Sequence, residues 1–150
     1  MKNLFAATDA DELKARIALL QPGTEPLWGK MSVAQMLAHC ALGMQMATGE
    51  LRTGRVFLGR ILGQFIKPKV MANDEPIRRN TPTMKELIIP VEPDFATEQT
   101  RLTQAIEQFH AAGPKACTTH PHPFFGPMTP DEWAILGYKH IDHHLRQFGV

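Results

Sequence analysis

Histidine is the residue type in this chain whose number and spacing could do chemistry. Seven histidines occur in 150 residues, against one tyrosine and two tryptophans. Two of them, His140 and His144, are four residues apart near the C-terminus. In a helix of about 3.6 residues per turn, this spacing places both imidazoles on one face, one turn apart. Because such a pair can supply two ligands to one metal ion, the spacing predicts a metal site.

A third ligand would have to come from another part of the chain, and His39 is our candidate. It lies beside the apolar stripe of a predicted helix, where it could line a cleft between helices. Three neutral imidazoles suit a divalent transition metal such as zinc, nickel or iron better than magnesium or calcium, and they leave positions open for water or substrate. Gln35 and Gln147 stand one turn from these histidines and could orient a ligand or contact a substrate, as could His143.

The histidines also have a purely structural interpretation, as hydrogen-bonded residues of a helical core. A metalloprotease motif is disfavoured, because Ile141 stands where the general-base glutamate of H-E-x-x-H would be. Cys117, His120 and His122 could form a second cluster, but the prolines between them favour a surface loop. Cys40 falls within an apolar stripe, which favours core packing over nucleophilic chemistry.

Amphipathic segments with recognisable ends predict the elements that position these residues. Four strong helices are expected, and a fifth at 55–66 is weakened by its glycines. The four strong helices cover residues 9–21, 33–48, 95–112 and a segment that begins at 130. Two proline-rich connections, 67–93 and 115–128, join helices, and a short strand is expected at 87–89. The pattern predicts one all-α domain over residues 1–150, a four-helix bundle with long proline-rich connections.

The composition fits a globular domain and disfavours several classes of protein. Apolar residues make up 43% of the chain, charged residues 21%, and the net charge is +1. A nucleic-acid binder is therefore not expected, although residues 52–79 carry a local charge of +5 against −4 elsewhere. The two cysteines form no disulfide framework and no export signal is apparent, so we expect a cytoplasmic protein. The apolar stretch at 56–66 is too short to span a membrane, and no membrane partner is expected.

Three blocks of the sequence carry a resemblance to a known group of proteins. The blocks are 28–40, 80–87 and 122–148, and the resemblance extends from about residue 27 to the C-terminus. They are similar to the bacterial DinB/YfiT-like superfamily of metal-binding four-helix bundles, and within it to a small branch of unknown function. The resemblance implies the same fold class that the helical periodicity predicts.

The resemblance also implies a ligand set and a range of activities. In the superfamily, one histidine of the second helix and an H-x-x-x-H pair of the last helix bind a divalent ion. Here these positions are His39, His140 and His144, and the adjacent His143 leaves the choice ambiguous by one residue. Characterised relatives include S-transferases and isomerases that use a low-molecular-weight thiol, and others are described as metal-dependent hydrolases.

Two functions are therefore open. The first is a metal-dependent enzyme that activates water or a thiol for hydrolysis or S-transfer on a small molecule, with His143, Gln147 or His122 as proton shuttle or substrate contact. The alternative is a non-catalytic metal- or ligand-binding helical module. A homodimer is a further expectation, because Gly59 and Gly63 would let another helix approach closely.

Overall fold

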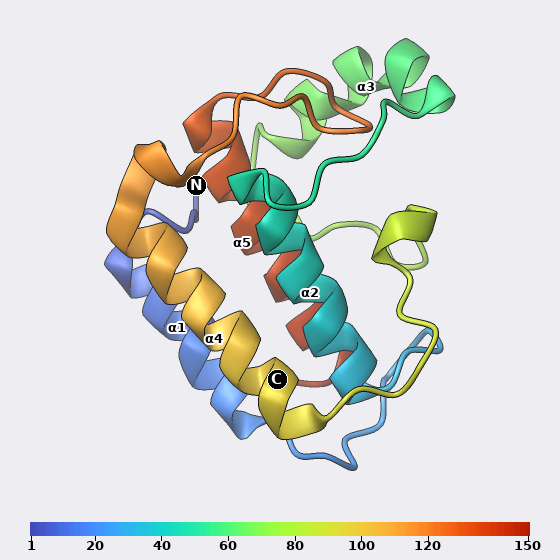
Figure 1. The fold of residues 1–150 in the computed structure, drawn as a ribbon, viewed down its shortest axis with the longest axis vertical. Coiled ribbons are helices and arrows are strands. Elements are labelled where there is room, and N and C mark those ends of the chain that lie inside the picture. Colours follow the sequence, from blue (N-terminus) through green and yellow to red (C-terminus); the bar gives the residue numbers. More distant parts are fainter.

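The computed structural model describes residues 1–150 and consists of five α-helices, two 3₁₀ turns and no strand (Figure 1). The α-helices are α1 (Ala7–Leu19), α2 (Val33–Thr48), α3 (Phe57–Val70), α4 (Phe95–Ala112) and α5 (Pro130–Gln147). The 3₁₀ turns are η1 (Lys85–Leu87) and η2 (Gly113–Ala116). The predicted all-α class is confirmed. None of the helices is long and apolar enough to cross a membrane.

The helix starts follow the sequence signals closely. Ser32 and Gln35 form a reciprocal capping box at α2, and Thr129 and Glu132 form another at α5. The side chain of Asp94 accepts a hydrogen bond at the start of α4. These caps satisfy backbone N–H groups that have no partner within the helix, and they explain why the starts of α2, α4 and α5 were predictable.

Three predicted boundaries or elements differ from the structure. The first helix begins and ends two residues earlier than predicted. The third runs four residues beyond its predicted end and includes Pro68, whose fixed φ is compatible with a helix. The strand predicted at 87–89 is wrong, because η1 ends at Leu87, residues 88–90 have no regular structure, and the carbonyls of Leu87 and Ile89 accept hydrogen bonds from side chains of α2.

The core lies among α1, α2, α4 and α5. The pairs in contact are α2 with α4, α2 with α5, α1 with α4 and α1 with α5. Leu37 of α2, Ile106 of α4 and Leu145 of α5 are fully buried in one cluster of 23 apolar residues. Since α2 and α5 pack against each other, their polar residues at this contact are brought together in the interior.

The helix α3 stands apart, at one end of the molecule (Figure 1). Its buried residues are Gly59 and Gly63, which lie against the loop that contains Phe124. A Cβ atom added at Gly59 would lie 2.6 Å from the Phe124 Cα, and one at Gly63 would lie 2.1 Å from the Phe124 carbonyl oxygen. The glycine face that suggested a homodimer is therefore occupied by the chain's own loop.

The packing of α3 predicts that a glycine-to-alanine substitution in this helix lowers the free energy of unfolding instead of raising it. At an unhindered helical position, replacing glycine by alanine stabilises a protein by roughly 0.5–1 kcal/mol. For Gly63→Ala we expect the free energy of unfolding to fall by about 1–3 kcal/mol instead, because the helix or the loop must move. Urea denaturation measures the difference. Gly54→Ala is the matched control, because a Cβ there meets nothing within 4 Å; an unchanged or raised value for Gly63→Ala would contradict this packing.

Candidate metal centre

Three histidines converge where α2 packs against α5. His39 of α2 and His140 and His144 of α5 each offer one nitrogen, and these three atoms lie within 4.8 Å of one another. The Nε2 atoms of His39 and His140 are 2.9 Å apart. Two imidazole nitrogens bound to one zinc ion at about 2.1 Å stand about 3.4 Å apart in tetrahedral geometry. The observed spacing is compatible with a shared divalent ion. No other group of three His, Cys, Asp or Glu side chains has its ligand atoms this close together.

The protonation of two of the rings follows from their partners. The carbonyl oxygen of Leu87 can only accept a hydrogen bond, so the His39 Nδ1 that lies 2.9 Å away carries a proton. Similarly, the Gln147 amide nitrogen donates to the carbonyl oxygen of Trp28, which turns Gln147 Oε1 towards His144 Nδ1 at 2.8 Å. His144 Nδ1 is therefore a donor as well. Both rings keep Nε2 unprotonated, which is the form that can ligate a metal ion.

Burial keeps all three rings neutral near pH 7. Desolvation lowers the pKa of His39 and lowers the pKa of His140 well below its ordinary value. The pKa of His144 falls to about 3, because of desolvation first and the neighbouring His39 second. His39 and His144 are only 2% and 8% exposed, and His140 is somewhat more accessible. Neutral imidazole is the ligating form, so the site does not have to lose a proton before an ion binds.

The long connection between α3 and α4 lies along α2 and forms part of the site. Side chains at the N-cap and on the first turns of α2 hold it: Ser32 Oγ donates to the Glu92 carboxylate at 2.7 Å, and Gln35 Nε2 donates to the Ile89 carbonyl oxygen at 3.1 Å. The bond from His39 to Leu87 continues this row. Gln35 thus fixes the connection, and its contact with a ligand or substrate stays a prediction.

His143 lies beside the cluster and is not one of its three members. Its ring centroid is 5.0 Å from that of His144 and 5.8 Å from that of Trp28. The Arg79 guanidinium lies over the Trp28 ring, 4.1 Å from the centroid. Desolvation lowers the pKa of His143, so this ring is neutral at pH 7 as well.

His122 has a role in the loop that α3 packs against. Its Nδ1 accepts hydrogen bonds from the backbone N–H groups of Phe124 and Phe125, each at 3.1 Å. The ring also packs on Trp133, with centroids 5.5 Å apart. Burial and the nearby Arg55 lower the pKa of His122 to about 4. The remaining two histidines, His110 and His120, each bond a backbone carbonyl away from the cluster.

Two glycines that the sequence did not single out leave space for the side chains of His140 and Gln147. A Cβ at Gly43 would lie 3.0 Å from His140 Nδ1, and a Cβ at Gly29 would lie 2.5 Å from Gln147 Nε2. Gly29 also has φ of 83°, which disfavours any side chain. A glycine in the middle of a helix, as Gly43 is in α2, is a signal for close approach that the sequence does contain.

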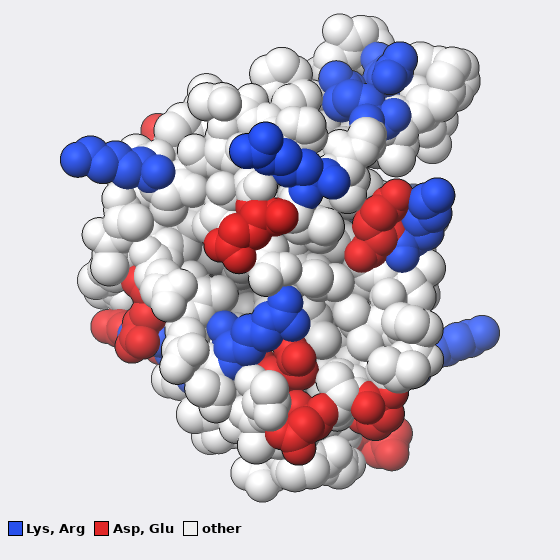
Figure 2. All heavy atoms as spheres, viewed as in Figure 1, with Lys and Arg blue, Asp and Glu red and all other residues white.

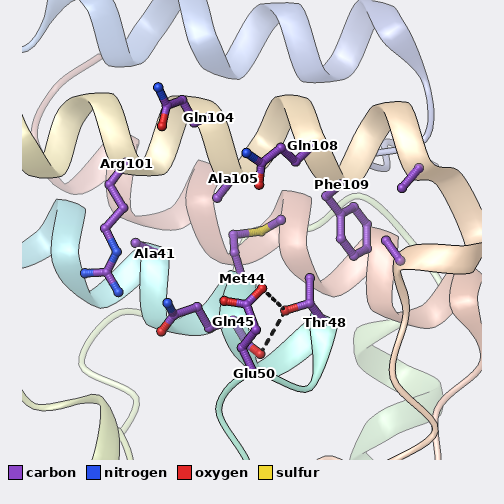
Figure 3. A pocket seen from close by; sticks show the side chains of 12 residues that line it. Ala41, Met44, Gln45, Thr48, Glu50, Arg101, Gln104, Ala105, Gln108 and Phe109 are labelled. Carbon is purple, nitrogen blue, oxygen red and sulfur yellow. Dashed lines mark hydrogen bonds between the residues drawn. The ribbon is translucent and has the colours of Figure 1, made fainter.

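A separate groove lies between α2 and α4 (Figure 3). Its volume is about 390 Å³, and its polar walls include Gln45, Arg101 and Gln104. At one end, Thr48 Oγ1 donates to Glu50 Oε1 at 3.1 Å. None of the clustered histidines lines this groove.

Comparison with known proteins gives one match. A family model described as "Protein of unknown function (DUF1569)" matches residues 2–149. No curated protein and no solved structure matches the chain. The DinB/YfiT-like resemblance and the ligand roles of the three histidines therefore stay predictions.

The hydrogen bond from His144 to Gln147 predicts a loss of metal affinity on substitution. Gln147→Met keeps the length of the side chain but removes the acceptor that fixes His144, so zinc affinity should fall by about 10- to 100-fold. Competition with a chromophoric chelator measures it. Gln108→Met, at an exposed position of α4, is the matched control. Equal affinities of Gln147→Met and wild type would show that this bond does not orient a ligand.

The buried neutral histidines also predict how acid affects the metal-free protein. The pKa of His144 is about 3 in the folded state against a reference of 6.5. Between these values only the unfolded chain binds the proton, so the free energy of unfolding falls as the pH drops from 6.5. The slope is up to about 1.4 kcal/mol per pH unit for this residue. Urea denaturation over this range measures it, and His144→Gln should give a shallower slope; equal slopes would contradict the prediction.

Proposed function

We propose that this chain, which belongs to the DUF1569 family of proteins of unknown function, is a metal-dependent enzyme that acts on a small molecule. The observation that supports this most strongly is the convergence of three neutral imidazoles, two of which have Nε2 left free by a fixed tautomer. The proposal includes a DinB-like four-helix bundle formed by α1, α2, α4 and α5, and a cytoplasmic location.

In this proposal His39, His140 and His144 hold a divalent transition metal such as zinc, nickel or iron. Such an ion, when bound, lowers the pKa of water or of a thiol and so makes a nucleophile available at neutral pH. Leu87 and Gln147 keep two of the rings oriented, and the small exposed fractions of His39 and His144 limit the access of bulk water. Three protein ligands leave a position for the reacting molecule.

A ring nitrogen of His143 is the proposed acceptor for the proton that the nucleophile releases. His143 lies next to His144 and is neutral, because desolvation lowers its pKa. No carboxylate belongs to the histidine cluster. Asp142, the nearest acidic residue along α5, is instead paired with Arg16 at 2.7 Å and with Arg146 at 2.8 Å.

If the nucleophile is a thiol, it must come from a small molecule and not from the chain. Burial raises the pKa of the Cys40 thiol far above neutrality, and its Sγ contacts the Met36 sulfur in the core. Burial raises the pKa of Cys117 to about 11. Neither forms an appreciable fraction of thiolate at pH 7, which supports a free low-molecular-weight thiol as the co-substrate of an S-transfer reaction.

The second candidate is a non-catalytic metal-binding module. The observation in its favour is the burial of His39 and His144, because a site with two almost wholly covered rings resembles a structural ion site more than an open catalytic one. In that case the ion would contribute to the free energy of folding directly. Circular dichroism before and after chelation distinguishes the two, because a structural site should lose most helical signal and an enzyme site should keep it.

Metal analysis tests the proposal that both candidates share. Protein purified without a nickel column should contain about one equivalent of a transition metal, and the double variant His140→Ala with His144→Ala should contain almost none. The matched control is His110→Ala with His120→Ala, because these histidines bond only backbone carbonyls. Less than about 0.2 equivalents in the wild type, or metal retained by the double variant, would refute a three-histidine site.

A further inference from the structure

The helix α3 exposes the apolar face that a helix normally buries. Six of the eleven large apolar side chains that are exposed in this protein lie within its fourteen residues. They include Phe57 and Phe65, which are 78% and 64% exposed. The full set is Phe57, Leu58, Ile61, Leu62, Phe65 and Ile66. A contiguous apolar surface of this kind on a folded domain marks an interaction site.

The packing of α3 fixes this orientation. At about 100° per residue, the six apolar side chains cover an arc of about 180°, and the two glycines fall together beyond one edge of it. Gly59 and Gly63 face inward, where a Cβ would collide with the backbone of Phe124. Rotating α3 to bury the apolar arc would drive larger side chains into that loop, so the apolar face must point outward.

The charged residues of α3 and of the segment around it are basic. Residues 51–73 contain five lysines and arginines and neither aspartate nor glutamate. Lys67 pairs with Glu132 of α5, and Arg55 bonds the carbonyl oxygens of Pro123 and Gly59. Arg60 and Lys69 are exposed on α3 itself. In Figure 2 the side chains over α3, at the top of the molecule, are basic or uncharged.

The apolar face and the basic charge of α3 favour an anionic lipid surface as its partner over a second copy of the chain or a nucleic acid. A second copy that placed its own α3 here, as a two-fold dimer would, brings basic residues against basic residues. A nucleic acid would neutralise the charge but leave the apolar face in water. An anionic lipid surface matches both the apolar face and the basic charge. The apolar side chains enter the boundary of the acyl chains, and lysine and arginine meet the headgroups.

We propose that α3 binds the surface of a membrane that contains anionic lipids. It lies parallel to the surface, with Phe57, Ile61 and Phe65 inserted and with Arg60 and Lys69 at the headgroups. Residues 56–66 are too short to span a membrane, and on that ground no membrane partner is expected from the sequence, but a helix that lies on the surface needs no such length. This inference is independent of the proposed metal site.

Vesicle sedimentation tests the proposal. Wild-type protein should sediment with vesicles of phosphatidylcholine that contain about 30% phosphatidylglycerol, much less with phosphatidylcholine alone, and less again when salt screens the headgroups. Ile61→Gln with Phe65→Gln should weaken the binding by at least about tenfold. Arg60→Gln with Lys69→Gln should weaken it and reduce its salt dependence.

The matched control replaces exposed apolar residues elsewhere. Leu19→Gln with Val91→Gln changes positions that are 65% and 70% exposed but lie outside α3, and it should bind vesicles as wild type does. Circular dichroism checks that each variant stays folded. The proposal is overturned if wild type does not sediment with anionic vesicles, or if the α3 variant binds as well as wild type. Two further results would overturn it. One is a dimer, seen by sedimentation velocity, that the Ile61→Gln with Phe65→Gln variant loses and the control variant keeps. The other is nucleic-acid binding, seen in a gel shift, with the same dependence on these variants.

Discussion

Three imidazole rings in mutual contact inside a helical protein are the constraint on which the site depends. Each ring can be buried there only as the neutral form, because a charge would lie in a desolvated region beside two other rings. A neutral ring still has one N–H to satisfy, and the protein satisfies those of His39 and His144 with Leu87 and Gln147. The free nitrogens then point at one another, an arrangement that costs free energy unless hydrogen bonding or a metal ion compensates for it.

The proline-rich connection between α3 and α4 follows from the same requirement. A backbone carbonyl is a good acceptor for a buried N–H only if its segment is held in place and does not use that carbonyl in regular structure. The segment 85–92 meets both conditions, because the Leu87 and Ile89 carbonyl oxygens bond no backbone N–H group, and the side chains of Ser32, Gln35 and His39 hold the segment. The polar residues on this face of α2 are therefore explained by a long connection that packs on the helix.

The sequence predicts some parts of this structure well because their causes are local. Side-chain N-caps and apolar periodicity locate α2, α4 and α5, and helical spacing alone brings His140 and His144 to one face. The Leu87 carbonyl could not be predicted, since every residue carries one and its contact with His39 spans 48 positions. Likewise a helical wheel places Lys139 and Asp142 on the outward side of α5. Both are buried, because the connection and α1 cover them: Lys139 donates to the Asn73 carbonyl oxygen and Asp142 pairs with Arg16.

The contact between His39 and Leu87 couples the proposed metal site to the connection between α3 and α4. An ion that requires His39 in its observed orientation binds more tightly when the connection is docked, and by reciprocity the bound ion stabilises the docked connection by the same free energy. The connection is also held one turn before His39, where Gln35 donates to the Ile89 carbonyl oxygen. Movement of this segment to admit a substrate would therefore loosen a ligand at the same time. In the proposed enzyme, substrate access and ligand geometry are thus linked at His39, whereas a structural ion would hold the connection closed.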